Sequence, residues 1–415
     1  MGSVDLKAVF TGVRPSGCVQ PYLGGFAAEL ISAGYAKLPV RDYVRSAAHL
    51  GRWMDSCNLE MEQLGEPVIA RFAQHKCQCP LSWRHGHRPT ARYVNRVRRF
   101  VLYLARQKVI VPLAQPRPKL VPAPLDGFST WMMQHRGLKP RTVQRYVRLI
   151  EEMLPALGHD TASYNAAHIR GVLLQKVKQL SPGYSKTYVT ALRAFLRFLA
   201  VQGKCQSHLD RAVPTLPEWR LSTLPRYLER DDIDRLIASC DLDKPVGIRD
   251  RAILLLMVRL GLRAGDIMAM RLDDLDWEAG TVRVIGKGRK EVCLPLAQDA
   301  GEALIEYLVK ARPAANIDRV FLCTNAPLRP ISHSPTVSGI VQAALRRAGI
   351  VNAPSKGAHL LRHSAATTML RSGASLDVIA TVLRHQSTDT TAYYAKVDIQ
   401  MLSEITQPWP EESPC

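Results

Sequence analysis

Four short segments in the C-terminal half of the chain combine residue types that can cut a phosphodiester. Arginine side chains bind phosphate oxygens in pairs, imidazoles accept or give a proton, and a tyrosine hydroxyl can bond covalently to phosphorus. In chain order, the candidate residues are Arg263, Lys287, His359, Arg362, His385 and Tyr394.

The first candidate lies at a predicted helix boundary. Gly261 ends a helix predicted over 250–260, so Arg263 occupies the turn before the next helix. Asp266 falls in the first turn of that next helix, where a carboxylate suits the helix dipole and could orient a guanidinium.

The second candidate lies at a predicted hairpin. Alternating residues predict strands over 281–285 and 291–294, and Lys287 is at the tip of the glycine-flanked turn between them. A lysine at such a tip can reach into a groove.

The remaining candidates fall on three predicted helices. His359 and Arg362 are three residues apart on a helix that ends before Gly373, so they share a face and can address one phosphate. His363 lies four residues after His359 on the same helix. A structural role as a buried helix histidine explains it at least as well as a role in the site. His385 follows a helix that begins near Ser375, and Tyr394 lies on the next short helix.

The order Arg, hairpin Lys, His-x-x-Arg, His, Tyr resembles the tyrosine recombinase, or phage integrase, family. The resemblance covers the C-terminal block and, more loosely, the block before it. It implies that Tyr394 is the nucleophile and that the other five candidates are catalytic. Asp266 stands where the family often has Glu, and Tyr393 competes in register, but the nine-residue spacing from His385 favours Tyr394.

The implied reaction follows from the residue types. The two arginines, helped by His385, would stabilise the charge that develops on the phosphate oxygens. His359 would accept the proton of the tyrosine, and Lys287 would give one to the departing 5′ oxygen. The product is a 3′-phosphotyrosyl bond that conserves bond energy, so no cofactor, metal or ATP is expected. The sequence contains no Walker-type loop and no spaced set of carboxylates.

Charge favours a polyanionic partner. The 415 residues include 56 Lys and Arg against 36 Asp and Glu, a net charge of +20, while 47% hydrophobic residues suffice for folded cores. DNA is the first candidate partner and an anionic membrane surface the second. No apolar run reaches the length of a membrane span, and no signal peptide pattern begins the chain, so we expect a cytoplasmic, nucleoid-associated prokaryotic protein with reduced cysteines.

Two proline-rich stretches, within 111–124 and 204–225, divide the chain. They predict an N-terminal helical domain (1–112), a second helical domain (123–205), a catalytic domain (226–400) and a tail (401–415). The expected fold is mainly α, with a small antiparallel sheet in an α+β catalytic domain. By resemblance, the second block is a core-binding domain that clamps DNA.

The first two blocks resemble each other. Tyr43-Val44-Arg45 follows Gly34 at the spacing at which Tyr146-Val147-Arg148 follows Gly137, and a second match pairs the segments that begin at Tyr93 and Tyr188. Duplication is the favoured interpretation, and chance similarity of amphipathic helices is the alternative. The first block could be a second DNA clamp, an arm-site binder or a contact surface for sister recombinases.

Basic residues gather on two predicted helices of the second block. A stripe of cations is often only a solvated face, but the net charge favours contact with DNA phosphates. The predicted DNA-binding residues are Arg141, Arg145, Arg148, Lys186 and Arg193.

A metal site is not favoured. The motif His75-x-Cys77-x-Cys79, followed by His85-x-His87, lacks the usual Cys-x₂₋₄-Cys spacing of zinc sites, and neighbouring residues suggest a surface loop. Four other cysteines have apolar neighbours and are expected in cores: Cys57, Cys240, Cys293 and Cys323.

These observations predict a site-specific recombinase that acts on duplex DNA with specific core sites, for integration, excision or transposition of a mobile element. A homotetramer on DNA, with or without sister recombinases, is the expected assembly, and an apolar segment after Tyr394 could dock on a neighbouring protomer. Two alternatives are a type IB topoisomerase, which usually has Lys in place of His359, and a catalytically silent protein that bridges DNA sites.

Overall fold

The computed structural model describes residues 9–11, 13, 17–79, 86–112, 123–216, 224–285, 291–385 and 388–396. Helices dominate these residues and a small antiparallel sheet lies in the C-terminal block, which confirms the predicted fold class. Contacts group residues 114–222 as one compact unit and the rest of the chain as another. Within the described ranges, no helix is both long and apolar enough to cross a membrane.

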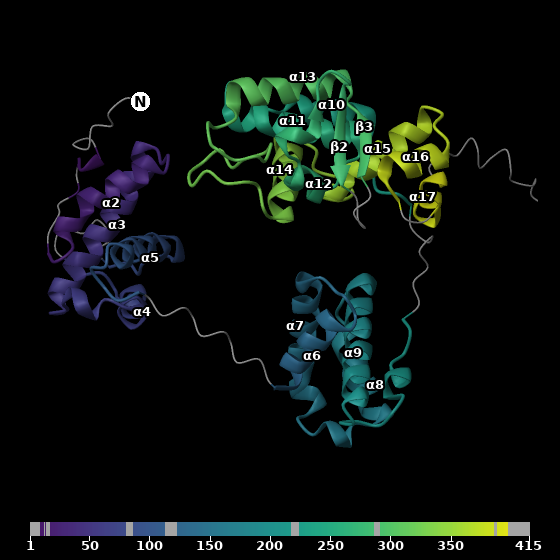
Figure 1. Ribbon diagram of the computed structural model, residues 1–415, viewed down its shortest axis with the longest axis horizontal. Helices are drawn as coiled ribbons and strands as arrows, with labels where there is room; N and C mark the ends of the chain where they lie inside the picture. Colours follow the sequence, from purple (N-terminus) through teal and green to yellow (C-terminus); the bar gives the residue numbers. More distant parts are fainter. Residues whose placement is uncertain are drawn as a thin grey trace, which may run out of the picture. The chain divides into compact units, whose positions relative to one another are not determined.

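The N-terminal block is a helical bundle with its own hydrophobic core (Figure 1). Its elements are α2 (Gln20–Ser32), α3 (Lys37–Ser56), the short η1 (Met61–Gln63), α4 (Glu66–Gln74) and α5 (Ala91–Arg106). The Thr90 side chain caps α5 by accepting from the backbone N–H of Tyr93, and one face of α5 is buried along its length.

The second block repeats that order of elements. It consists of α6 (Ala123–Gln134), α7 (Pro140–Leu157), η2 (Thr161–Ser163), α8 (Ala166–Val177) and α9 (Pro182–Val201). Prolines at the starts of α7 and α9 cost no hydrogen bond there, because the first N–H groups of a helix have no intrahelical partner.

Details of the two bundles also agree. The chain leaves the first helix of each bundle through a glycine with positive φ, +82° at Gly34 and +57° at Gly137. An edge-to-face aromatic pair joins the first and last helices of each core. The ring centroids are 5.1 Å apart for Phe26 and Phe100 and 5.3 Å apart for Phe128 and Phe195.

The second block extends beyond its predicted end at residue 205. A short helix, η3 (Leu209–Ala212), follows α9, and Leu209 and Val213 are buried in the core of this block. The prediction of a linker over 204–225 was therefore wrong for residues up to Val213, which pack against the core of this block. The prolines of that stretch begin only at Pro214, after these residues.

The C-terminal block is helical around a small sheet (Figure 1). Its helices are α10 (Arg230–Ala238), α11 (Pro245–Leu260), α12 (Ala264–Ala269), η4 (Leu272–Asp274), α13 (Gln298–Glu306), η5 (Tyr307–Ala311), α14 (Ser334–Arg347), α15 (Ala358–Arg371), α16 (Leu376–Leu383) and α17 (Thr388–Ala395). The buried helix α11 packs against both α13 and α15 and forms the centre of the core.

The sheet has the order β1 (Leu275–Asp276), β2 (Thr281–Ile285), β3 (Glu291–Pro295), with antiparallel neighbours. The predicted hairpin is thus present, with a third short strand beside it. On β2, Val282 and Val284 are buried, whereas Arg283 and Ile285 are exposed. Cys293 on β3 is exposed, so its predicted place in the core was wrong.

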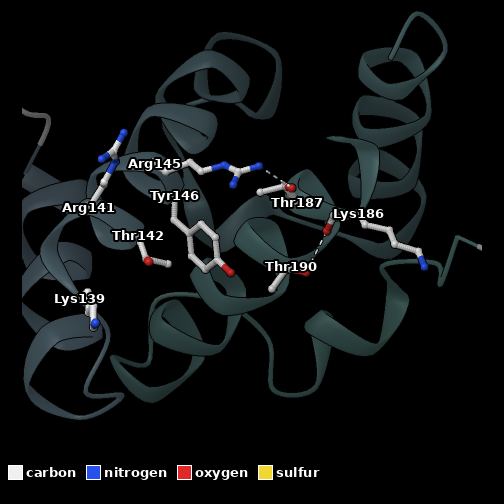
Figure 2. A pocket seen from close by; sticks show the side chains of 8 residues that line it. All are labelled: Lys139, Arg141, Thr142, Arg145, Tyr146, Lys186, Thr187 and Thr190. Carbon is white, nitrogen blue, oxygen red and sulfur yellow. Dashed lines mark hydrogen bonds between the residues drawn. The ribbon is translucent and has the colours of Figure 1, made fainter. Parts of the chain in front are cut away.

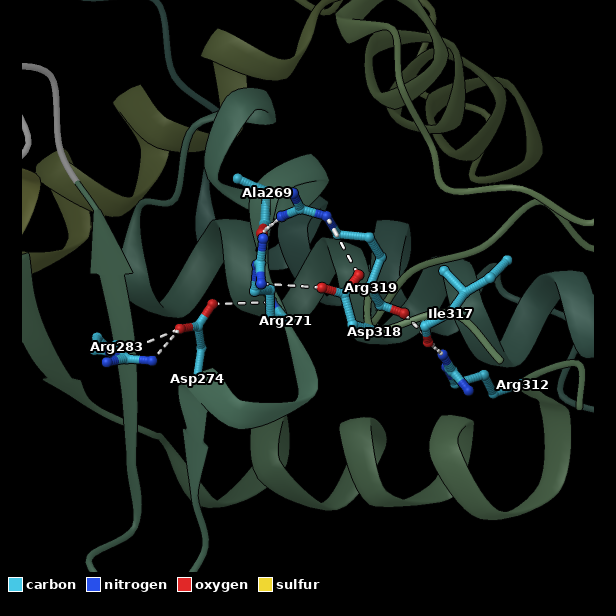
Figure 3. Close-up of polar contacts among 8 residues, drawn as sticks. All are labelled: Ala269, Arg271, Asp274, Arg283, Arg312, Ile317, Asp318 and Arg319. Atoms are coloured by element: carbon cyan, nitrogen blue, oxygen red, sulfur yellow. Dashed lines mark hydrogen bonds and ion pairs between the residues drawn. The ribbon is translucent and has the colours of Figure 1, made fainter. Parts of the chain in front are cut away.

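A polar network fixes the base of this hairpin (Figure 3). The buried Asp274 carboxylate accepts from the backbone N–H of Arg271 at 2.9 Å and from the Arg283 guanidinium of β2 at 3.0 and 3.1 Å. Arg271 also pairs with Asp318 at 3.1 Å, and Arg319 donates to the carbonyl of Ala269 at the end of α12. The sheet is thereby tied to the helix that follows Arg263.

We expect Asp274→Ala to destabilise the protein by about 1–3 kcal/mol, because it removes the buried carboxylate that accepts from the N–H of Arg271 and from the guanidinium of Arg283. Urea unfolding of the full chain measures the change. The exposed neighbour Asp273→Ala is the matched control and should stay within about 0.5 kcal/mol of wild type. Equal midpoints for the two variants would show that the network does not stabilise the block.

Candidate functional site

Two helix ends converge on the Arg362 guanidinium. From α15, this buried side chain donates to the carbonyl of Gly261, at the end of α11, at 2.5 Å, and to the carbonyl of Leu383, at the end of α16. Gly261 has φ +60°, and a Cβ there would lie 2.3 Å from the Leu383 side chain. The site therefore requires glycine at this position, which agrees with the predicted helix end.

Arg263 occupies the N-cap of α12. Its backbone N–H donates to the Asp266 carboxylate at 2.8 Å, and its guanidinium donates to the carbonyl of Arg384 at 3.3 Å. The sequence led us to expect that Asp266 could orient a guanidinium. The guanidinium that it pairs with is that of Arg384, a residue that the sequence did not single out.

Arg384 has an unusual backbone and an unusual side chain. Its φ of +54° places it in the left-handed region, where a side chain costs free energy that glycine would avoid. The side chain is only 6% exposed and forms an ion pair with Asp266, whereas its Nε and Nη1 atoms have no hydrogen-bond partner among the described residues. This backbone conformation directs the guanidinium into a buried ion pair beside Arg263.

Tyr394 lies on α17 and is 2% exposed, inside a small cluster of apolar residues from α15 and α16. Its ring is stacked on that of His385 with centroids 6.2 Å apart, and His385 Nδ1 is 2.8 Å from the Thr391 hydroxyl. The neighbouring Tyr393 hydroxyl donates to the carbonyl of Leu224 at 2.7 Å. Of the two tyrosines, Tyr394 is the one whose hydroxyl faces the candidate site.

His363 contacts that hydroxyl. The distance from His363 Nδ1 to the Tyr394 oxygen is 2.7 Å, a hydrogen bond, whereas none joins His359 to Tyr394 among the described residues. The His359 ring lies 6.4 Å from the His363 ring. The sequence predicts that His363 lies on the same helix as His359. It does not show whether His363 contacts a tyrosine or only packs in the core, because that depends on where α17 lies.

Burial, with repulsion between neighbouring cations, lowers the pKa values of the two arginines Arg263 and Arg362 and of the histidines around them. Burial is the main cause that lowers the pKa of Arg362 to about 10, and the positive charge of Arg263 adds to it. Burial also lowers the pKa of Arg263. Burial, followed by Arg362 and Arg263, lowers the pKa of His359, and it lowers that of His385 to about 4. These directions mark a pocket of positive charge that an anion would stabilise.

Tyr394 is held protonated. Burial raises its pKa to about 12 against the opposing effect of Arg362, and burial together with His359 lowers the pKa of His363 to about 4. At neutral pH, the structure therefore presents a phenol hydrogen-bonded to a neutral imidazole, next to two arginines.

The remaining catalytic candidate, Lys287, lies outside the described residues, as does the tail over 401–415. The hairpin that carries Lys287 is paired up to Ile285 and Glu291, whose Cα atoms are partners in the register of β2 and β3. Its position relative to the arginines stays a prediction.

The second block has a basic groove of about 480 Å³ (Figure 2). Three of the predicted DNA-binding residues line it, namely Arg141, Arg145 and Lys186. The other lining residues are Lys139, Thr142, Tyr146, Thr187 and Thr190. Arg145 donates to the Thr187 hydroxyl at 2.9 Å, which joins α7 to α9 across the groove.

Two other predicted DNA-binding residues do not line this groove. Arg148 approaches Glu152 at 3.6 Å and the Tyr184 hydroxyl at 3.2 Å. Arg193 donates to the Val213 carbonyl at 2.8 Å and to Thr215 at 2.9 Å. The segment after α9 folds back onto Arg193 and binds its guanidinium. The sequence showed only that Arg193 lies on a basic helix and did not reveal this contact.

The cysteine and histidine motif of the first block is not a surface loop over its described part. Cys77 and Cys79 are buried, and their sulfur atoms lie near the imidazoles of His49 and His75. His85 lies outside the described residues. Of the cysteines expected in cores, Cys240 is buried, whereas Cys57 and Cys323 are half-buried.

Comparison with known proteins places this site in a family. The profile of the phage integrase family matches residues 226–401. The protein y4rA of Sinorhizobium fredii (strain NBRC 101917 / NGR234), whose name calls it an integrase/recombinase, is 35% identical over 406 residues, 96% of each chain. Tyrosine recombinase XerC of Vibrio cholerae is 30% identical over 296 residues, 70% of this chain and 93% of the relative.

A solved structure agrees in fold. The XerH site-specific recombinase, in a post-cleavage complex with its palindromic difH substrate, matches with a TM-score of 0.56 and 20% identity, over 69% of this chain and 85% of that one. The structural match at 20% identity shows a shared fold, whereas 35% identity over 96% of y4rA shows a shared family. The chain belongs to the phage integrase family of tyrosine recombinases, the enzymes of site-specific recombination.

Proposed function

We propose that the chain cuts and rejoins duplex DNA at specific core sites through a 3′-phosphotyrosyl bond to Tyr394. One observation carries the proposal. The buried Arg362 and the half-buried Arg263 repel each other beside a tyrosine hydroxyl, and the carboxylate acting on them, Asp266, is already paired with Arg384. A phosphodiester supplies the anion that such a pocket needs, and the tyrosine supplies the nucleophile.

Arg263 and Arg362 bind the non-bridging oxygens of the phosphate. Both guanidinium groups are anchored by backbone carbonyls, so they need little reorganisation as charge develops in the transition state. His385, stacked on Tyr394 and held by Thr391, donates a further hydrogen bond.

Bonds and protons balance without an added reactant. The Tyr394 oxygen forms a bond to phosphorus as the bond from phosphorus to the 5′ oxygen breaks. The tyrosine proton passes to a neutral imidazole, for which His363 is in contact and His359 is the residue implied by the family resemblance. Lys287 protonates the leaving oxygen. One ester replaces another, so the proposal requires neither ATP nor a catalytic metal.

The helical blocks hold the DNA. The groove of the second block is lined by four cations, which suits a phosphate backbone. The first block repeats the order of elements of the second, and we take it to be a duplicated bundle that adds contacts with DNA or with a sister recombinase. A homotetramer on DNA, in the cytoplasm, is the assembly we propose.

A role in moving a mobile element fits the integrase/recombinase name of y4rA. The second candidate, a silent DNA-bridging protein, is opposed by the proximity of Arg263, Arg362, His385 and Tyr394 in one site. A cleavage assay separates the two candidates.

We expect Tyr394→Phe to bind DNA like wild type and to form no covalent complex, because the attacking oxygen is removed. The assay uses nicked element-end DNA in EDTA and scores a band that survives denaturant. Tyr393→Phe, which deletes the neighbouring hydroxyl, is the matched control and should retain the band. A band with Tyr394→Phe would exclude this nucleophile, and its absence from wild type despite binding would favour the bridging protein.

Stability should fall as the pH is lowered from about 6.5 toward 4. Burial lowers the pKa of His363 and of His385 to about 4, against about 6.5 unfolded, so the unfolded chain binds more protons in this window. Each histidine contributes on the order of 1 kcal/mol, allowing for its partial exposure. His363→Gln should flatten the pH dependence of Tm, whereas the exposed His333→Gln should not. Parallel curves for all three proteins would refute this account.

Replacing two groove cations should weaken DNA binding in a salt-dependent way. For Arg141→Ala with Lys186→Ala, we expect the slope of log affinity against log salt to become shallower by about 2, since each lost phosphate contact contributes about 0.9. The pair Lys204→Ala with Arg211→Ala, exposed cations of the same block outside the groove, should leave the slope unchanged. Fluorescence anisotropy on duplex DNA measures both. Equal slopes for the two double variants would exclude the groove as the phosphate-binding face.

A further inference from the structure

Four metal-binding side chains meet inside the N-terminal block. One ligand atom each from His49, His75, Cys77 and Cys79 lies within 4.8 Å of all the others. Cys77 and Cys79 are 0% and 3% exposed, and His49 is 2% exposed. His49 comes from α3, and the other three follow the end of α4. No step of the recombination reaction uses them.

The chain after α4 is shaped to present these three ligands together. His75 leaves the helix in an extended conformation, and burial then alternates, with Lys76 and Gln78 exposed and the two cysteines buried. In extended backbone, residues two apart face the same side, so the spacing His-x-Cys-x-Cys places all three side chains on the buried side of this segment. The observed positions of their ligand atoms bring them together with His49.

Both imidazoles are oriented for coordination through Nε2. His75 Nδ1 is hydrogen-bonded to the carbonyl of Phe72, so Nδ1 carries the proton and Nε2 has a free lone pair. That Nε2 is buried and has no hydrogen-bond partner in the part of the chain that the structure describes. His49 Nδ1 lies 2.9 Å from the Tyr93 hydroxyl, and its Nε2 lies 3.2 Å from the Cys77 sulfur. Such outer contacts are what fixes metal-binding histidines.

We propose that these four residues bind one zinc ion as a Cys₂His₂ site. With zinc bonds of about 2.0–2.1 Å to nitrogen and 2.3 Å to sulfur, the edges of the tetrahedron are about 3.3–3.8 Å, so the ligands close in by at most about 1.5 Å. Binding displaces two thiol protons, and two thiolates then cancel the charge of Zn²⁺. A neutral centre is one that a buried site can hold.

Among the described residues of the second block, no such cluster of metal-binding side chains occurs. Glu152 on α7 accepts from Tyr188 on α9, where His49 and Tyr93 make the equivalent contact between α3 and α5. The α8–α9 connection is short, whereas the α4–α5 connection carries the cysteines and returns on itself. There, the backbone N–H of Gly86 donates to the Cys77 carbonyl at 2.8 Å. Zinc would fasten that longer connection to α3.

The first test measures zinc in full-length protein purified without chelator under reducing conditions. Elemental analysis should find about one zinc per chain, and none in Cys77→Ser or Cys79→Ser. Cys18→Ser, a half-buried cysteine of the same block outside the cluster, should keep the zinc. Chelation of wild type should lower Tm, and Cys18→Ser should respond equally.

Cobalt substitution covers the case in which the cysteine variants do not fold. Wild type loaded with Co²⁺ should show the visible bands of tetrahedral cobalt and a thiolate-to-cobalt charge-transfer band. Three results would overturn the proposal. They are wild type that takes up no zinc when Zn²⁺ is added under reducing conditions, cobalt spectra without thiolate bands, and a Cys77–Cys79 disulfide found by mass spectrometry in freshly isolated protein.

Discussion

The arrangement of the site depends on the Arg362 guanidinium and the two helix ends that it joins. Carbonyls at a helix C-terminus have no partner within the helix and carry partial negative charge, so a buried cation stabilises them. By donating to Gly261 and Leu383, Arg362 fixes the ends of α11 and α16. Arg263 and His385 follow within two residues of those ends. One side chain thus aligns the segments that carry two of the other candidate catalytic residues.

The same burial acts on the charged groups and on Tyr394, the proposed nucleophile. It lowers the pKa values of Arg362 and His385 and raises that of Tyr394, so the free protein holds concentrated positive charge next to a protonated phenol. A phosphate entering this pocket would relieve the repulsion and lie next to a hydroxyl that has yet to lose its proton. In the reaction proposed above, substrate binding and activation of the nucleophile would share one electrostatic cause, the exclusion of water.

Much of this could be predicted from the sequence, because the signals are local. The helix end at Gly261, the hairpin strands and the helices that carry His359 and Tyr394 follow from glycine placement and periodicity. Other features depend on contacts between distant segments. Sequence spacing does not reveal that α17 brings Tyr394 to His363. It also does not show that α3 contributes His49 to the cysteines after α4, which is why the motif looked like a surface loop.

The ion pair between Arg384 and Asp266 limits which substitutions this site can tolerate during evolution. Removing the charge at either position alone would leave a buried charge without its ion-pair partner, at a cost of about 3–5 kcal/mol. Glycine at 384 would suit the backbone but would leave Asp266 with only backbone partners. Homologous chains are therefore expected to exchange the two residues as a pair, so that position 384 reports the identity of position 266.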